Sequence, residues 1–311
     1  MKKLLIAYDG SPCSDAMLGD LIHAGLPGEL DATILSVADV WLPPNPELKE
    51  PAFPNPVSKA VRKARARAVA EVEASQALAD SAYKKLQKLF PKWNLRAKAI
   101  ADSPAWGIIK EASALKAELI VLGSHGRSPV GRFFLGSVAH KVAGQAHRSV
   151  RIARPHEKPA DAKLRILIAV DGSSDSQAAV QAVALRIWPF STEFRVIAVI
   201  DPRARTAVAW PGVYPEQWDW AQARDKTPED WVARMLQHSA RKLVDAGLKP
   251  QTDFYDGDPK QVLLREAEDW QADCIFLGAR GLHHGTGLML GTTASAIASR
   301  AHCSVEIVRP Q

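Results

Sequence analysis

The sequence predicts an α/β protein made of two repeated, doubly wound domains, each with a parallel sheet covered by helices on both faces. Three observations support this. The chain has 311 residues, which at roughly 150 residues per domain corresponds to about two domains. One block of sequence occurs twice, and within each copy short apolar runs alternate with longer helical patterns, as in βα units.

The repeat is visible at three places along the chain. Leu-Leu-Ile-Ala-Tyr-Asp-Gly-Ser at 4–11 returns 162 residues later as Ile-Leu-Ile-Ala-Val-Asp-Gly-Ser. Leu-Ile-Val-Leu-Gly at 119–123 and Ser-Val-Arg-Ile at 149–152 return 155 residues later. A polar, proline-containing stretch separates the copies. We therefore expect domains at 1–155 and 164–311, joined by a linker at 156–163.

The elements follow from apolar patterning. Near-continuous Val/Ile/Leu/Ala runs predict strands that are buried on both faces. The predicted strands are 3–8, 32–38, 95–100, 118–123 and 149–153 in the first copy, and 164–170, 193–200, 250–255, 273–278 and 304–308 in the second. The predicted helices of the first copy are 14–25, 57–90, 104–116 and 137–147, with start signals at Ser14 and Ser103-Pro104. Segments 41–56 and 201–228, rich in Pro, Trp and charge, are variable excursions after the second strand of each copy.

Composition excludes several classes of protein. The three cysteines are odd in number and lack CxxC spacing, which argues against a disulfide scaffold and a four-ligand zinc site. No stretch has the apolar length of a secretory signal or a membrane span, so we expect a cytoplasmic protein. A basic run at 59–67 could attract nucleic acid. Alternating Ala and Val favour a solvated helix face instead, and nucleic acid is not the expected partner.

A glycine pattern follows the fourth strand of each copy. Both copies obey G-x2-G-x9-G-[S/T], at Gly123, Gly126, Gly136 and Ser137, and again at Gly278, Gly281, Gly291 and Thr292. Glycine lets the backbone approach a ligand closely, and a helix start offers free N–H groups to phosphate. The pattern therefore predicts phosphate binding; the alternative is that these glycines only make strand-to-helix turns.

An aspartate ends the first strand of each copy, Asp9 and Asp171, directly before Gly-Ser. In an open parallel sheet, ligands bind outside the carboxyl ends of the strands where the strand order reverses. A carboxylate there can accept hydrogen bonds from a ribose or an adenine edge. Asp-Gly-Ser is equally common in ordinary turns and helix caps.

These motifs, with a Ser-Val-x-Asp second strand in the first copy and a final strand ending in Arg-Pro, make the chain similar to a tandem universal stress protein. The resemblance covers nearly the whole of both copies. It implies five parallel strands in the order 3-2-1-4-5 and members that pair through their last strand, which a tandem chain can do internally as a pseudo-dimer; a homodimer is also possible. It further implies an ATP site, with Mg²⁺, in one or both copies. The residues that it assigns are Asp9, Val37, Gly123, Gly126, Gly136 and Ser137, and Asp171, Val199, Gly278, Gly281, Gly291 and Thr292.

The chain departs from the family pattern in two places. After the third strand the second copy keeps Gly257-Asp258-Pro259, whereas the first has Asp102-Ser103-Pro104, which brings a carboxylate near the expected phosphate. Three arginines, Arg127, Arg132 and Arg280, could neutralise phosphate charge or simply face solvent. We include Arg127 among the expected binding residues.

The motifs leave three functions open. The sequence lacks G-x4-G-K-[S/T] and a G-x-G-x-x-G after the first strand, which argues against a Walker-type NTPase and a dinucleotide enzyme. The first hypothesis is a stress-response regulatory protein that binds adenine nucleotide and signals to an unidentified protein partner by a shift in conformation. The second is a slow ATP hydrolase or nucleotidyl-transfer enzyme that uses Asp9 or Asp171. The third is a structural pseudo-dimer with empty pockets.

Overall fold

All strands of the described chain form one continuous sheet. The computed structural model describes residues 2–41, 56–126, 135–155, 159, 163–201, 228–282 and 290–310. The first half of the chain (residues 1–155) contributes β1 (Lys3–Ala7), β2 (Asp31–Ala38), β3 (Asn94–Ala101), β4 (Leu119–Gly123) and β5 (Ser149–Ala153). The second half (residues 164–311) contributes β6 (Arg165–Val170), β7 (Glu193–Ile200), β8 (Pro250–Asp256), β9 (Cys274–Gly278) and β10 (Ser304–Val308).

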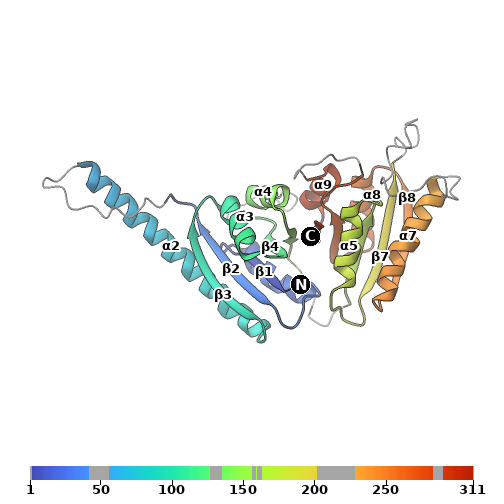
Figure 1. Cartoon of the computed structure of the whole chain (residues 1–311), viewed down its shortest axis with the longest axis horizontal. Coiled ribbons are helices and arrows are strands. Elements are labelled where there is room, and N and C mark those ends of the chain that lie inside the picture. Colours follow the sequence, from blue (N-terminus) through green and yellow to red (C-terminus); the bar gives the residue numbers. More distant parts are fainter. Residues whose placement is uncertain are drawn as a thin grey trace.

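The strand order is β3-β2-β1-β4-β5-β10-β9-β6-β7-β8. Each half therefore has the order 3-2-1-4-5, as the resemblance implied, and the pairs within each half are parallel. The two halves meet where β5 and β10 pair antiparallel. The expected internal pairing through the last strands is confirmed, and both chain ends lie near the middle of the molecule (Figure 1).

Helices cover both faces of this sheet (Figure 1). They are α1 (Pro12–Asp20), followed by the 3₁₀ turn η1 (Leu21–His23), α2 (Pro56–Leu89), α3 (Pro104–Leu115) and α4 (Ser137–Gln145) in the first half, and α5 (Ser174–Ala184), α7 (Pro228–Asp245), α8 (Pro259–Asp269) and α9 (Thr292–Arg300) in the second. The predicted strands and first-half helices agree with these bounds to within a few residues, apart from the first helix, which ends five residues early. Of segments 41–56 and 201–228, nearly all lies outside the described residues.

Strand alternation assigns side chains to the two faces of the sheet. Leu4 and Ile6 point to the core under α1 and α2, whereas Leu5 points to the core under α3 and α4. The core under α3 and α4 continues without a break under α8 and α9, since Val150 and Val305 belong to it. On the opposite face each half keeps a core of its own. One face of the sheet thus carries a single apolar core that both halves share.

The first helix begins at Pro12 with Ser11 as its N-cap, so the prediction that Ser14 starts it was wrong. The Ser11 Oγ accepts a hydrogen bond from the Ser14 N–H at 3.2 Å, and the Ser14 Oγ donates to the Ser11 carbonyl at 2.9 Å. Ser173 and Ser176 repeat this arrangement with the same two distances. Ser14 therefore lies three residues past the N-cap and returns a hydrogen bond to it, and residue type alone does not distinguish Ser14 from the cap.

The basic run lies on the N-terminal turns of α2, the longest helix, which extends beyond the sheet (Figure 1). Arg62, Lys63 and Arg67 are exposed and Arg65 is half-buried. The expectation of a solvated helix face agrees with these exposures.

Candidate functional site

In the first half, Asp9 and the glycines of the motif lie at the carboxyl ends of β1 and β4. These strands are neighbours, with Ile6 opposite Val121, and their helices leave toward opposite faces of the sheet. The strand order therefore reverses between them, which is where an α/β sheet opens a crevice for a ligand. The second half repeats the arrangement with β6 beside β9, where Ile168 lies opposite Phe276.

The two strand-end aspartates adopt matching turns. The Oδ1 of Asp9 accepts a hydrogen bond from the Ser11 N–H at 3.0 Å, and the Oδ1 of Asp171 accepts one from the Ser173 N–H at 3.0 Å. Asp171 also accepts the Ser173 hydroxyl at 2.6 Å. The other oxygen of each carboxylate, Oδ2, lies against the second glycine of the motif, Gly126 or Gly281.

The first two glycines of each motif lie so close to other parts of the protein that a side chain would crowd its neighbours. A Cβ on Gly123 would lie 3.1 Å from the Cys13 backbone, where β4 meets the start of α1. A Cβ on Gly126 would lie 3.0 Å from the Oδ2 of Asp9. Gly278 and Gly281 repeat both approaches more tightly, with Cβ distances of 2.7 Å to Asp175 and to Asp171 respectively. These glycines therefore bring the loop against the aspartate and the helix start. This packing is what the structural alternative, glycines that only make strand-to-helix turns, requires.

The third glycine of each motif is the N-cap of the following helix. The Gly136 N–H donates to the Ser124 carbonyl at 2.8 Å, and the Gly291 N–H donates to the Ala279 carbonyl at 2.8 Å. Those two amides are therefore used within the protein. No side-chain hydrogen bond caps α4 or α9 in the part of the chain that is described, so the amides of their first turns are the ones that could receive an anion.

The hydroxyl residues Ser137 and Thr292 open these helices and are exposed. Thr292 also lines a hollow of about 440 Å³ with Lys260 and Arg300. The lining residues are spread along the length of α9, so the hollow follows the flank of the helix rather than its N-terminal end.

The strand-two valines lie deeper. Val37 and Val199 are half-buried and pack against the shared core. A Cβ on Gly107 would lie 3.2 Å from the Val37 Cγ1, so Val37 is under the first turn of α3. The unexpected carboxylate nearby, Asp102, binds Lys110 at 2.9 Å and the Ser103 N–H at 2.7 Å. Its charge is therefore already compensated.

Of the three arginines that could neutralise phosphate charge, only Arg280 is among the described residues. Arg127 and Arg132 lie outside the described residues, so their expected role is untested. Arg280 pairs with Asp175 on α5: its Nε is 3.1 Å from Oδ2, its Nη2 is 3.1 Å from Oδ1, and its backbone N–H donates to Oδ2 at 3.2 Å. The Arg280 pKa is raised by this hydrogen bonding and charge. In this arrangement the Arg280 guanidinium is engaged in an ion pair with Asp175, and a phosphate would have to compete with that carboxylate for it.

The first half holds Cys13 and His125 where the second holds Asp175 and Arg280. The His125 Nδ1 lies 3.1 Å from the buried Ser124 hydroxyl. Its Nε2 is buried and has no hydrogen-bond partner among the described residues. Burial, and then the charge of Arg154, lower the pKa of His125. A buried nitrogen without a partner is costly unless something binds it, and this one lies in the loop expected to bind phosphate.

Several of these residues were missed in the sequence. Ser173, Asp175 and Cys13 were not singled out, although aligning the copies 162 residues apart places Cys13 opposite Asp175. That substitution of a thiol for a carboxylate was the available signal that the two sites differ.

The described residues include neither a metal-binding cluster nor a membrane-spanning helix. They contain no cluster of three or more His, Cys, Asp or Glu arranged to hold a metal ion. In the same residues, no helix combines the length and apolar character needed to cross a membrane.

Comparisons with known proteins give the same family for both halves of the chain. The family model described as Universal stress protein family matches twice, at residues 1–154 and 164–309. A universal stress protein of Mycolicibacterium smegmatis is 26% identical over 208 residues, which cover 63% of this chain and 63% of that relative. The chain thus spans less than two thirds of that relative's length. Universal stress protein YxiE of Bacillus subtilis is 24% identical over 146 residues, covering 47% of this chain and 98% of that protein.

Among solved structures, a universal stress protein from Archaeoglobus fulgidus superposes with a TM-score of 0.61 at 18% identity, covering 99% of this chain and 98% of the other. This likeness concerns the fold of the whole tandem. With both halves matched by one family model, the chain belongs to the universal stress protein family and carries two of its domains in tandem.

Proposed function

We propose that this protein binds an adenine nucleotide, ATP with Mg²⁺, and acts as a regulatory protein of the stress response rather than as an enzyme. One observation carries the proposal: at the strand-order reversal of the first half, Asp9, the glycine loop and the start of α4, which no side chain caps, lie together at the carboxyl ends of β1 and β4. Helix-start amides favour phosphate, and a strand-end carboxylate suits a sugar hydroxyl or an adenine edge.

We further propose that the first half is the stronger nucleotide site. In the second half, the cation that could face phosphate, Arg280, is held by the buried carboxylate of Asp175. In the first half, Cys13 replaces that carboxylate, and the His125 Nε2 still lacks a protein partner among the described residues. There a phosphate oxygen or ribose hydroxyl can supply the missing hydrogen bond. The Arg127 side chain, one residue beyond Gly126, would add positive charge.

The residues present fit a nucleotide in named roles. Asp9 would orient the adenosine, Val37 would contact the base, and the first-turn amides of α4 with Ser137 would hold the phosphates. In the second half the same roles would fall to Asp171, Val199 and Thr292. Binding would favour the state in which the glycine loop is ordered, and a protein partner would recognise that state.

The test is calorimetric titration of the full chain with ATP and Mg²⁺. Asp9→Asn keeps an acceptor for the Ser11 N–H but removes the charge, and Asp171→Asn is its matched control in the other half. We expect Asp9→Asn to weaken ATP binding at least tenfold and Asp171→Asn to leave the first, tight binding event unchanged.

The opposite pattern would move the site to the second half. A wild-type chain that neither releases heat nor gains thermal stability with millimolar ATP would overturn the function itself, because a ligand that binds only the native state must stabilise it. Release of ADP by pure protein, lost in Asp9→Asn, would favour the hydrolase alternative.

A further inference from the structure

The two halves meet on an axis of approximate twofold symmetry marked by two opposite charges. In the antiparallel pair, Arg151 of β5 lies directly opposite Glu306 of β10. These positions are also equivalents in the repeat, 155 residues apart. The approximate twofold axis therefore passes between Arg151 and Glu306. If two identical halves paired through this strand, each residue would face its own copy.

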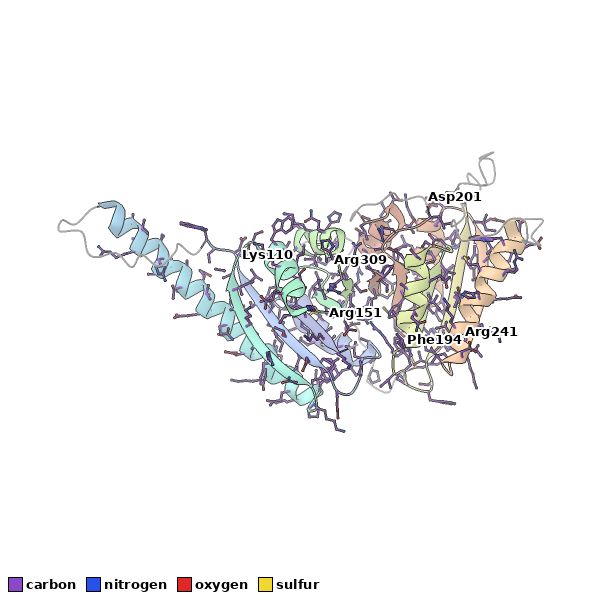
Figure 2. The ribbon with its side chains drawn as sticks, in the orientation of Figure 1. Lys110, Arg151, Phe194, Asp201, Arg241 and Arg309 are labelled. Atoms are coloured by element: carbon purple, nitrogen blue, oxygen red, sulfur yellow. The ribbon has the colours of Figure 1, made fainter. Side chains whose placement is uncertain are left out.

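Arg151 and Glu306 belong to a buried network of four charges. The Arg151 guanidinium binds Asp20 of its own half, with Nε 2.7 Å from Oδ2 and Nη2 3.0 Å from Oδ1. Glu306 binds Arg186 of its own half. The two pairs join across the axis, where the Arg151 Nη1 lies 3.4 Å from the Glu306 Oε2. All four residues are at least nine-tenths buried, and Figure 2 shows Arg151 in the middle of the molecule.

The two halves contribute different charged residues to this network, so the network does not repeat with the sequence. The repeat equivalent of Asp20 is Ala182, and that of Arg186 is Ala24. The first half thus places its arginine at the axis with an aspartate behind it, whereas the second half places its glutamate at the axis with an arginine behind it. No operation that pairs a half with itself reproduces this order of charges.

The other face of the same strands has no such polarity. Val150 and Ile152 pair with Ile307 and Val305, and all four are fully buried in the shared core. Apolar side chains of similar size would accept either pairing, hetero or homotypic, because burial of apolar surface is non-directional. The apolar face therefore stabilises the contact without selecting the partner.

We propose that the Arg151–Glu306 pair, supported by Asp20 and Arg186, selects the partner: it restricts strand pairing to the two unlike halves and excludes pairing of either half with its own kind in a second chain. A homotypic first-half pair would place two buried guanidinium groups against each other across the axis, each with only its own Asp20 as counter-ion. A homotypic second-half pair would place two carboxylates there, each with only its own Arg186. Buried like charges are strongly unfavourable, and interfaces use such juxtaposition to reject wrong partners.

The experiment uses the folded full chain with a protease site introduced after Pro155. The purified protein is cleaved between the halves, unfolded in denaturant, refolded, and the resulting pairs are counted by native mass spectrometry. The wild type is expected to give almost only heteropairs. The variant Asp20→Asn, Arg151→Met, Arg186→Met, Glu306→Gln replaces the network by neutral groups of similar shape, a change that a fold often tolerates. It is expected to give about half heteropairs, the random share when no partner is rejected.

A matched control separates stability from selection. Arg154 and Arg309 are buried arginines at the same interface, but the repeat keeps them identical. Arg154→Met with Arg309→Met should lower the stability of the pair and leave the heteropair share unchanged. Homotypic pairs at the random share in the wild type, heteropairs alone in the neutral variant, or randomised pairing in the control would each overturn the proposal.

Discussion

The guanidinium of Arg280 grips the carboxylate of Asp175 at two points, and this ion pair ties the loop after β9 to the first turn of α5. Asp175 is only 2% exposed. The first half has Cys13 and His125 at the equivalent positions, so its described residues do not repeat this ion pair. Two domains with one fold therefore anchor their glycine loops by different chemistry.

Removing this tie should destabilise the protein. Arg280→Ala leaves the buried carboxylate of Asp175 without its cation, and we expect the free energy of unfolding to fall by about 1–2 kcal/mol, a value reduced because Arg280 is partly exposed. Urea unfolding followed by circular dichroism measures it. Lys85→Ala is the control, because the Lys85–Asp15 pair is nearly half exposed on both sides and should cost less than about 1 kcal/mol. Equal losses in the two variants would contradict the buried tie.

The two final arginines cap helices of the opposite half. The Arg154 Nη2 donates to the Ala298 carbonyl of α9 at 2.6 Å, and the Arg309 Nη2 donates to the Ala143 carbonyl of α4 at 2.8 Å. A cation at a helix C-terminus also meets the negative end of the helix dipole. Each of Arg154→Met and Arg309→Met should lower the free energy of unfolding by about 1.5–3 kcal/mol. Guanidinium titrations test this, with exposed Arg265→Met expected to stay within about 0.5 kcal/mol of wild type.

The cysteines should differ sharply in reactivity. Cys274 and Cys303 are buried, and burial raises the pKa of Cys274 to about 12 and also raises that of Cys303. Cys13 is half-buried at the start of α1. Since the thiolate is the reactive form, a thiol reagent at pH 8 should modify Cys13 alone in the native protein and all three cysteines in denaturant. Rapid modification of two cysteines in the native protein would contradict this assignment. So would modification of the native Cys13→Ser variant by the reagent.

Stability should decrease on mild acidification because of His125. Its pKa is lowered in the folded protein, mainly by burial and then by Arg154, and returns toward 6.5 in the unfolded chain. Between these two values the unfolded chain binds more protons, so the contribution is complete above pH 6.5 and is lost as the pH falls toward the folded pKa. Thermal unfolding from pH 7.5 to 5 should show a smaller decline in His125→Gln than in wild type. Parallel declines would show that His125 does not titrate this way.

Local patterning accounts for how much of the fold could be predicted. Strand and helix positions depend on the spacing of apolar residues, which each segment carries itself, so β1 to β10 were found to within a few residues. The boundary error at Ser14 has a local cause, since Ser11 and Ser14 bond to each other and both resemble caps. The sequence predicted that these glycines and aspartates follow the first and fourth strands, but G-x2-G does not show that Gly123 and Gly278 pack against the starts of α1 and α5. Their role in binding stays a prediction.

By itself, the sequence determined the tandem repeat, the alternation of strands and helices, and the glycine and aspartate residues that end β1 and β4. Only the tertiary structure decided what each charge meets: that Arg280 belongs to Asp175, and that Arg151 and Glu306 face each other across an approximate twofold axis. The physical reason is range. Apolar periodicity can be recognised within about a dozen neighbouring residues. A buried charge is stable only beside an oppositely charged partner, and here the fold brings those partners from more than a hundred residues away in the sequence.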